Sequence, residues 1–399
     1  MRLGYLVPEF PSQTHVFFWR EIQALAGRGI DVKLVSTRMP SQLGRHKFVN
    51  EAVHRTHYLL PPTRSLLLKS VMRALKKRTC AITYINSLAQ RTTTVQTAAL
   101  IYAAAQLTEW AALQNVAHVH GHSCAYSAHV LALSRLLGGP NYSLTLHGDL
   151  DVYGDDHAAK MTGASFVSAV GTHLIDQIVA RVGLPREKLF TTFMGIDAGA
   201  LAAIADQRTY DEVNMRILTV ARLERNKGHE YALAAVRRAR DEGMNIRYTI
   251  VGGGQFRNEI VAMVDKLGLQ NDVELLGSLA EEGVFDSLRT SDVFLLPSVG
   301  KGEAWPVAVM EAMGAGMPVV ATDIGATSEM IANGRDGFLV RQREPNDIVE
   351  VLRSLYQSSE LRRSIGRQAR ATAVARFAVE RSAESLLAQV ERSLRTAGG

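Results

Sequence analysis

The sequence is poor in cysteine, with only Cys80 and Cys124 among its 399 residues. The two do not form a pair at the spacing typical of a zinc site, and two thiols cannot form the framework of a disulfide-rich scaffold. We therefore expect neither a disulfide framework nor a metal site built on cysteine, and we expect both thiols to be buried or unreactive.

The sequence also lacks an apolar stretch of the roughly 18 residues that a membrane-spanning helix needs. Near the N-terminus, Pro8, Glu9 and Pro11 interrupt the first apolar run, and Arg2 is the only early basic residue, which is unlike a secretory signal peptide. These features predict a cytoplasmic location. A composition of 47% hydrophobic and 21% charged residues is typical of a globular protein, and the length suggests two domains.

Positive charge is concentrated in the first half of the chain. Residues 1–200 contain 20 Lys and Arg against 12 Asp and Glu, whereas the net charge of the whole chain is +6. Basic and apolar residues alternate within residues 61–93, a pattern that suits an anionic membrane surface and equally suits an ordinary solvated helix face. No recognised nucleic-acid-binding module is present, so no nucleic-acid partner is predicted.

Strand and helix patterns alternate along the chain. The strand Leu3–Val7, a helix over 16–28 and the strand Val32–Thr37 form a β-α-β unit, which implies a parallel sheet. Residues 61–115 are expected to be mostly helical. Further strands are predicted at 56–60, 118–120, 142–146, 165–169, 217–221, 247–251, 273–277, 293–296 and 319–322. This is an α/β chain of two doubly wound domains, in which ligands bind at the carboxyl ends of strands and in a cleft between domains.

The stretch from Glu303 to Glu311 places two carboxylates around a predicted helix start. Pro306 suits a first helical position, because its missing N–H is not needed there. The amides of such a start bind phosphate, and carboxylates accept hydrogen bonds from sugar hydroxyls. The candidate ligand-binding residues here are Ser298, Glu303, Ala304, Trp305, Val307 and Glu311. The alternative is a purely structural role for both carboxylates.

Two further loops follow predicted strands of the second half. Arg222 and Lys227 follow the first of these strands, where two cations beside a helix start would stabilise a departing diphosphate. Gly252 and Gly253 follow the next strand, in a glycine turn that matches neither the dinucleotide fingerprint nor the phosphate-binding loop. Each loop could also be an ordinary connection.

Histidines gather at strand ends of the first half. His147 follows a predicted strand, where it is expected to face a ligand or to be structural. His118, His120 and His122 alternate and share one side of a strand, where a metal site is conceivable but lacks a carboxylate or cysteine. Gly195 is expected to act as a hinge glycine at the domain boundary.

In combination, these motifs resemble those of the family-four retaining glycosyltransferases. The resemblance spans nearly the whole chain and rests on Pro8–Thr14, His147–Gly148, Met194–Asp197, Arg222–Gly228, Gly252–Gly254, Glu303–Glu311 and Glu329. The opening residues 5–12 are similar to the branch that builds bacterial exopolysaccharides, including colanic-acid-type enzymes. The loop Ser12-Gln13-Thr14 departs from the Gly-Gly of many members.

The resemblance implies the GT-B fold, with two Rossmann-like domains facing a central cleft. Residues 1–200 would bind the acceptor, residues 201–377 the nucleotide-sugar donor, and residues 378–399 would form a helix that crosses back to the first domain. It also implies retaining, metal-independent transfer of a hexose, from a UDP-sugar ahead of GDP-mannose, to a lipid-linked or polysaccharide acceptor. No cofactor is expected.

The resemblance also implies roles for individual residues. Arg222 and Lys227 would hold the diphosphate, Glu303 the sugar hydroxyls and Glu311 the ribose, while His147 would lie at the reacting face. The remaining residues assigned to donor binding are Gly252, Gly253, Ser298, Ala304, Trp305 and Val307. Catalysis is thus assigned to His147, Glu303, Arg222 and Lys227, and the acceptor-side loop to Ser12, Gln13 and Thr14. Two alternatives stay open: a sugar-nucleotide epimerase or hydrolase of the same fold, and a non-catalytic sugar-nucleotide-binding scaffold.

Overall fold

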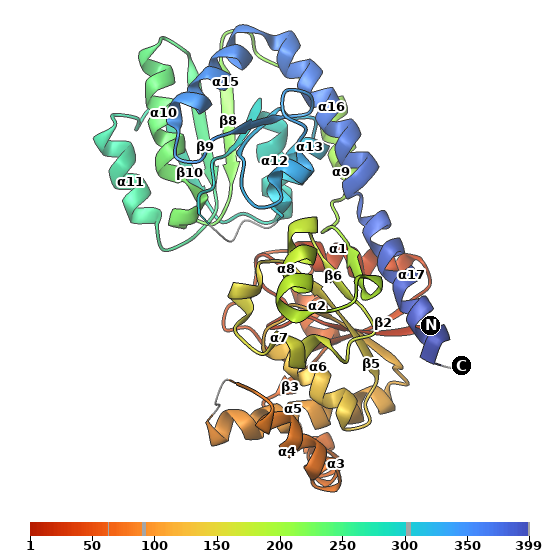
Figure 1. Ribbon diagram of the computed structural model, residues 1–399. Helices are drawn as coiled ribbons and strands as arrows, with labels where there is room; N and C mark the ends of the chain where they lie inside the picture. Colours follow the sequence, from red (N-terminus) through yellow and green to blue (C-terminus); the bar gives the residue numbers. More distant parts are fainter. Residues whose placement is uncertain (63, 90–92, 301–304, 398–399) are drawn as a thin grey trace. The chain divides into compact units, whose positions relative to one another are not determined.

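The computed structural model describes residues 1–62, 64–89, 93–300 and 305–397. The chain forms two compact units: unit 1 comprises residues 1–193 and the segment from 382 onward, and unit 2 comprises residues 194–381 (Figure 1). The sequence-based division at residues 200 and 377 differs from these limits by a few residues.

Unit 1 is built on a parallel sheet of seven strands in the order β3-β2-β1-β4-β5-β6-β7. The strands are β1 (Arg2–Leu6), β2 (Asp31–Arg38), β3 (Thr56–Leu60), β4 (His118–His122), β5 (Asn141–Leu146), β6 (Val167–Ala169) and β7 (Leu189–Thr191). From the middle of the sheet, β1, β2 and β3 follow one another toward one edge, and β4, β5, β6 and β7 follow one another toward the other edge. The switch point of the sheet therefore lies between β1 and β4.

The helices of unit 1 cover this sheet and form a helical insertion after β3. They are α1 (Val16–Gly27), α2 (Val49–Arg55), α3 (Arg64–Lys76), α4 (Arg78–Asn86), α5 (Thr94–Leu113), α6 (Tyr126–Leu136), α7 (His157–Met161) and α8 (Thr172–Val182), with short 3-10 turns at Leu150–Tyr153 and Arg186–Lys188. The expected helical stretch after β3 is thus confirmed as α3, α4 and α5, which Figure 1 draws in orange. Helix α5 packs against both α3 and α6.

The last helix, α17 (Val379–Ala397), contributes to the core of unit 1. Its residues Ala383, Leu386 and Val390 are buried in one cluster with residues of β1 and α1, among them Tyr5 and Ile22. The strongly amphipathic sequence of α17 explains this packing, because one apolar face is covered while the opposite face stays in water.

Unit 2 contains a second parallel sheet, of six strands in the order β10-β9-β8-β11-β12-β13. The strands are β8 (Met215–Val220), β9 (Ile246–Val251), β10 (Val273–Gly277), β11 (Val293–Leu296), β12 (Val319–Thr322) and β13 (Phe338–Val340). The switch point lies between β8 and β11. Two parallel sheets confirm the predicted α/β class; the three-residue edge strands β7 and β13 escaped prediction because they are too short to show a pattern.

The helices of unit 2 flank this sheet. They are α9 (Ala198–Asp206), α10 (His229–Asp241), α11 (Arg257–Lys266), α12 (Glu281–Thr290), α13 (Val307–Gly314), α14 (Thr327–Met330), α15 (Pro345–Gln357) and α16 (Ser359–Phe377), with a 3-10 turn, η3, at Arg225–Lys227. The core gathers apolar residues of β8, β9 and β11 with those of α10 and α15.

Gly195 lies where the chain enters unit 2, beside the end of α16. Its neighbour Ile196 donates to the carbonyl of Phe377 at 2.8 Å and accepts from the N–H of Val379 at 3.0 Å. A Cβ on Gly195 would lie 2.4 Å from the Cα of Val379. Glycine is therefore needed at position 195 because two chain segments pack closely there. From the sequence we expected only a hinge and did not predict this packing.

Candidate active site

The loops after β8, β9 and β11 lie together at the carboxyl edge of the unit 2 sheet. The N–H of Leu223 donates to the carbonyl of Gly253 at 2.9 Å, and the N–H of Val299 donates to the carbonyl of Asn226 at 2.8 Å. The structure therefore brings together three predicted loops that are far apart in the sequence, at the switch point where doubly wound sheets bind ligands.

Two glycines permit this close approach of backbones. Gly228 has φ +69°, and a Cβ there would lie 1.8 Å from the carbonyl oxygen of Pro297. A Cβ on Gly252 would lie 1.8 Å from the carbonyl oxygen of Ala221. No other residue fits at either position without moving the neighbouring loop.

The two predicted cations differ in environment. Arg222 is exposed and donates to Glu224 at 2.6 Å, whereas Lys227 is only 8% exposed at the end of η3. His229 Nε2 lies 3.1 Å from the carbonyl oxygen of Arg222, which ties this loop to the first turn of α10. Because exposed ion pairs add little stability, the guanidinium of Arg222 can turn to an anionic ligand at small cost. Sequence reasoning missed the pairing with Glu224, although the two residues are neighbours.

The start of α13 differs in detail from the prediction. Pro306 occupies the cap position before the first helical turn rather than the first helical position, and its own side chain accepts no hydrogen bond there. The amides of Val307 and Ala308 begin α13, where no helical carbonyl lies four residues earlier to accept from them, whereas the amide of Val309 donates to the carbonyl of Pro306 at 3.1 Å. Glu311 is 7% exposed on this helix. The predicted donor residues Glu303 and Ala304 lie outside the described residues.

The side chain of Trp305 is buried and packs against other side chains of unit 2. It is 3% exposed, its indole N–H donates to the sulfur of Met310 at 3.1 Å, and its ring meets Phe377 edge-on at 6.0 Å. A contribution of Trp305 to donor binding is therefore restricted to its backbone. The other predicted residue of this group, Ser298, is 1% exposed, and its carbonyl accepts from Thr322 at 2.6 Å.

In unit 1, His147 lies at the carboxyl end of β5. Its ring is half-buried beside Phe17 and Phe18, and its backbone N–H donates to the hydroxyl of Tyr153 at 2.9 Å. Burial, together with a smaller effect of the nearby His122, lowers the pKa of His147 to about 3. His147 is therefore neutral at physiological pH and can accept a hydrogen bond as well as donate one.

The three histidines of β4 share one buried face, as predicted. Ser143 Oγ lies 2.8 Å from both His118 Nε2 and His120 Nδ1, and Thr145 Oγ1 lies 3.0 Å from His120 Nε2. Hydroxyls thus occupy the ring nitrogens that a metal would need. Within the described residues, no group of three or more His, Cys, Asp or Glu side chains is arranged to hold a metal.

The loop Ser12–Thr14 is held against a neighbouring loop of unit 1. His46 Nε2 lies 2.7 Å from the carbonyl oxygen of Gln13, and the Gln13 side chain accepts from the N–H of Arg45 at 2.9 Å. The predicted acceptor-side loop therefore has a defined conformation at the end of β1, on the same edge of the sheet as His147.

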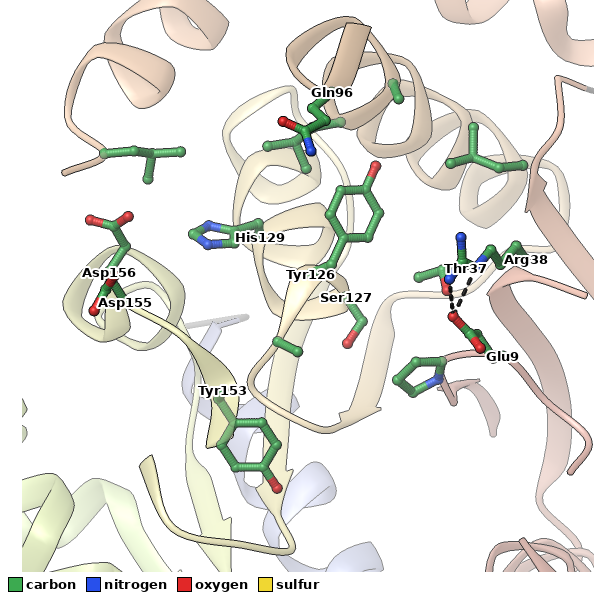
Figure 2. A pocket seen from close by; sticks show the side chains of 16 residues that line it. Glu9, Thr37, Arg38, Gln96, Tyr126, Ser127, His129, Tyr153, Asp155 and Asp156 are labelled. Carbon is green, nitrogen blue, oxygen red and sulfur yellow. Dashed lines mark hydrogen bonds and ion pairs between the residues drawn. The ribbon is translucent and has the colours of Figure 1, made fainter. Parts of the chain in front are cut away.

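A cavity of about 510 Å³ lies at this edge of unit 1 (Figure 2). Its polar lining is drawn from the loop after β1, from β2, α5 and α6, and from the segment after β5, and comprises Glu9, Thr37, Arg38, Gln96, Tyr126, Ser127, His129, Tyr153, Asp155 and Asp156. Figure 2 shows Asp155 and Asp156 on one side, the ion pair of Glu9 and Arg38 on the other, and Tyr126 between them. Sequence reasoning missed this cavity because the lining comes from separate segments.

The charged groups of the cavity are mostly carboxylates. Arg38 donates to Glu9 at 2.8 Å, so this pair is neutralised, whereas Asp155 is exposed. Burial lowers the pKa of His129 to about 4 and raises that of Tyr126 to about 12, so both are neutral at pH 7. Together with Asp156, the cavity offers several hydrogen-bond acceptors and neutral donors, which suits hydroxyl groups better than anions.

Helices α3 and α4 expose an unusual number of large apolar side chains. They include Leu67, Leu68, Val71, Met72, Leu75 and Ile82, of which Leu68 is 75% exposed. Exposed Lys69, Lys76, Lys77 and Arg78 lie among them. We call these ten residues the α3–α4 face. In the part of the chain that the structure describes, no helix has the length and apolar character required to span a membrane.

Comparison with known proteins agrees with this geometry. Residues 204–372 match the family model for glycosyl transferases group 1. The amylovoran biosynthesis glycosyltransferase AmsK of Erwinia amylovora is 25% identical over 377 residues, which cover 90% of this chain and 91% of that protein. The putative colanic acid biosynthesis glycosyltransferase WcaL of Escherichia coli K12 is 32% identical over 181 residues, 44% of each chain.

Solved structures show the same fold. Sucrose-phosphate synthase from Thermosynechococcus elongatus superposes with a TM-score of 0.74 and 17% identity over 100% of both chains. The Anabaena protein HepE in complex with UDP superposes with a TM-score of 0.71 and 17% identity, over 98% of this chain and 100% of that one. The predicted resemblance and architecture are thus confirmed: residues 204–372 match a glycosyl transferases group 1 domain, and the chain has the α/β fold of the GT-B glycosyltransferases.

Proposed function

We propose that this protein transfers a hexose from a nucleotide-sugar, with a UDP-sugar as the first candidate donor, to a lipid-linked or polysaccharide acceptor in exopolysaccharide synthesis. The names of AmsK and WcaL support the pathway, and the HepE structures with UDP and with UDP-glucose support the donor class. We further propose that transfer retains the anomeric configuration and needs no metal ion.

The observation that carries the proposal is the loop cluster of unit 2. Arg222 and Lys227 follow β8, and the start of α13 follows β11, the next strand in the sheet. Cleavage of the glycosidic bond builds negative charge on the leaving diphosphate, which two cations and the amides at a helix start stabilise. Glu311 would accept hydrogen bonds from the ribose, and Glu303 from the sugar hydroxyls.

For the acceptor we propose the cavity of unit 1. Its volume is that of a binding site for a small ligand, and its carboxylates and neutral aromatic residues suit the hydroxyls of an uncharged sugar. Asp155 and Asp156 would repel a uronate or phosphate placed against them. The acceptor sugar bound here is therefore expected to be uncharged.

For the lipid part of the acceptor we propose contact of the α3–α4 face with an anionic membrane. Leu68, Met72 and Leu75 follow one another at helical spacing and are 75%, 59% and 60% exposed. An apolar stripe that carries lysines among its members binds at the boundary of lipid headgroups and acyl chains. Such a contact would hold the acceptor's lipid near unit 1.

The donor is tested by thermal shift with UDP-, GDP-, ADP- and dTDP-sugars in the presence of a chelator. One donor should raise the melting temperature, and Lys227→Ala should abolish the shift, whereas the exposed control Lys266→Ala should retain it. No shift with any donor would contradict the assignment. Release of free sugar or of an altered sugar nucleotide without acceptor would favour the hydrolase or epimerase alternative.

The acceptor cavity is tested by kinetics with acceptor sugars once the donor is known. Asp155→Asn should raise the acceptor KM about 10-fold and leave the donor KM unchanged, because one hydrogen-bonding carboxylate is lost. The exposed Asp176→Asn, elsewhere in unit 1, is the matched control. An unchanged acceptor KM in Asp155→Asn would place the acceptor elsewhere.

The membrane contact is tested by flotation with vesicles of phosphatidylglycerol and phosphatidylcholine. The wild-type protein should float with anionic vesicles, and the double variant Leu68→Glu, Leu75→Glu should remain at the bottom. Equal flotation of both proteins would refute the assignment of the α3–α4 face.

A further inference from the structure

A chain of buried polar groups leads from the interior of unit 1 to His147. Glu21 of α1 is 8% exposed, and its carboxylate accepts from the hydroxyl of Tyr5 at 2.6 Å and from that of Ser382 at 2.7 Å. His122 Nε2 lies 3.5 Å from the same carboxylate, and His122 Nδ1 lies 3.0 Å from His147 Nε2. Side chains of β1 and α1 thus meet those of the sequence-distant β4 and α17 beneath the residue after β5.

The carboxylate decides which nitrogen of His122 carries the proton. A carboxylate only accepts hydrogen bonds, so a ring nitrogen that faces it is stabilised by carrying hydrogen and destabilised by presenting a lone pair. Nε2 of His122 therefore holds the proton, and Nδ1 holds the lone pair. Burial lowers the pKa of His122 to about 3, so its ring carries no second proton at pH 7.

The protonation of His122 in turn determines which nitrogen of His147 carries hydrogen. Because His122 Nδ1 is an acceptor, the nitrogen 3.0 Å away, His147 Nε2, must be the donor. His147 Nδ1 then carries the lone pair. This atom is shielded from solvent and has no hydrogen-bond partner among the described residues, although the ring itself is half-buried.

We propose that Glu21 and His122 are positioning residues that fix His147 in the Nε2–H tautomer, so that its Nδ1, shielded from solvent in this structure, is left as the acceptor for a substrate hydroxyl once the side chains around it move apart. This inference rests on the proposed function and deepens it. An unsatisfied acceptor at an active site gains its partner in the substrate complex, where such contacts tighten.

The other histidines of β4 follow the opposite pattern and serve as an internal reference. Ser393 donates to the carbonyl of Val390 at 2.7 Å, so His118 Nδ1, 3.4 Å from its hydroxyl, is the donor of that pair. Ser143 then donates to His118 Nε2 and accepts from His120 Nδ1–H. The geometry therefore assigns Nδ1–H to His118 and His120, but Nε2–H to His122 and His147.

The test is long-range ¹H–¹⁵N correlation of the full chain labelled with ¹⁵N-histidine, with assignment by single substitutions. In the wild type, His147 should show the Nε2–H pattern and His118 the Nδ1–H pattern. In Glu21→Gln, His147 should become a mixture of tautomers while His118 is unchanged, and kcat should fall about 10-fold or more with the donor KM unchanged. Circular dichroism checks folding of the variant.

A second variant tests whether the effect passes through His122. In a His122→Asn background, Glu21→Gln should have no further effect on the tautomer of His147 or on kcat, as a double-mutant cycle measures. An Nδ1–H pattern for His147 in the wild type overturns the inference, as does an equal effect of Glu21→Gln in both backgrounds. The tautomer spectra need no substrate, so a wrong donor assignment leaves this readout intact.

Discussion

The substitution Gly228→Ala tests whether the loops after β8 and β11 approach each other as closely as the structure has them. An added Cβ would lie 1.8 Å from the carbonyl oxygen of Pro297, whereas real Cβ contacts are essentially never shorter than 3.0 Å. The two backbones must therefore separate by about 1.2 Å, a displacement that overpacked sites accommodate at a cost of about 1–3 kcal/mol.

A second glycine of unit 2 separates this steric effect from the cost of a positive φ. Gly243 has φ +85°, close to the +69° of Gly228, but a Cβ there would meet nothing within 4 Å. Gly243→Ala should therefore cost only the left-handed conformation, about 1 kcal/mol. Gly228→Ala should cost about 2–4 kcal/mol in total.

The two variants should also differ in donor binding. Displacement of the loop moves Lys227 and the backbone of Arg222, so Gly228→Ala should weaken nucleotide binding about 10-fold, equivalent to about 1.4 kcal/mol, while Gly243→Ala should bind as the wild type does. Urea unfolding measures stability and calorimetry measures binding. Equal losses of stability together with equal affinities would refute the close approach of these loops.

Three further predictions concern stability, each measured by urea unfolding. Burial holds the pKa values of the three histidines of β4 below the unfolded value near 6.5, so between pH 7.5 and pH 5.5 only the unfolded chain gains protons at these residues. Each histidine should therefore lower the free energy of unfolding by about 1.4 kcal/mol as the pH falls across this range. A free energy of unfolding that does not change with pH would contradict their burial. Arg216→Met should lower the free energy of unfolding by about 3 kcal/mol, because it removes the guanidinium that pairs at 2.8 Å with the fully buried carboxylate of Asp292. A loss below 1 kcal/mol would mean that water reaches this carboxylate. Gly195→Ala should destabilise unit 2 by about 2 kcal/mol through its overlap with Val379, whereas the helical control Gly199→Ala should be neutral or stabilising.

The sequence by itself determined the fold class, because strand and helix periodicities alternate with short connections in both halves. It also located the loops that hold Arg222, Gly252 and Ser298, since each follows an apolar run that reads as a parallel strand. Their roles in donor binding stay predictions. What periodicity could not supply was the exact start of α13, because a helix boundary depends on which backbone groups find partners.

Only the tertiary structure decided which residues meet at a distance. Glu21 lies in the middle of an amphipathic helix and Ser382 lies 361 positions later, and neither carries a motif. The cavity beside Asp155 and the place of Trp305 against Phe377 likewise depend on segments that the sheet order brings together. Local sequence sets which elements form, whereas packing of the sheets and helices sets which of their polar groups become neighbours, and the tautomer of His147 is a consequence of that packing.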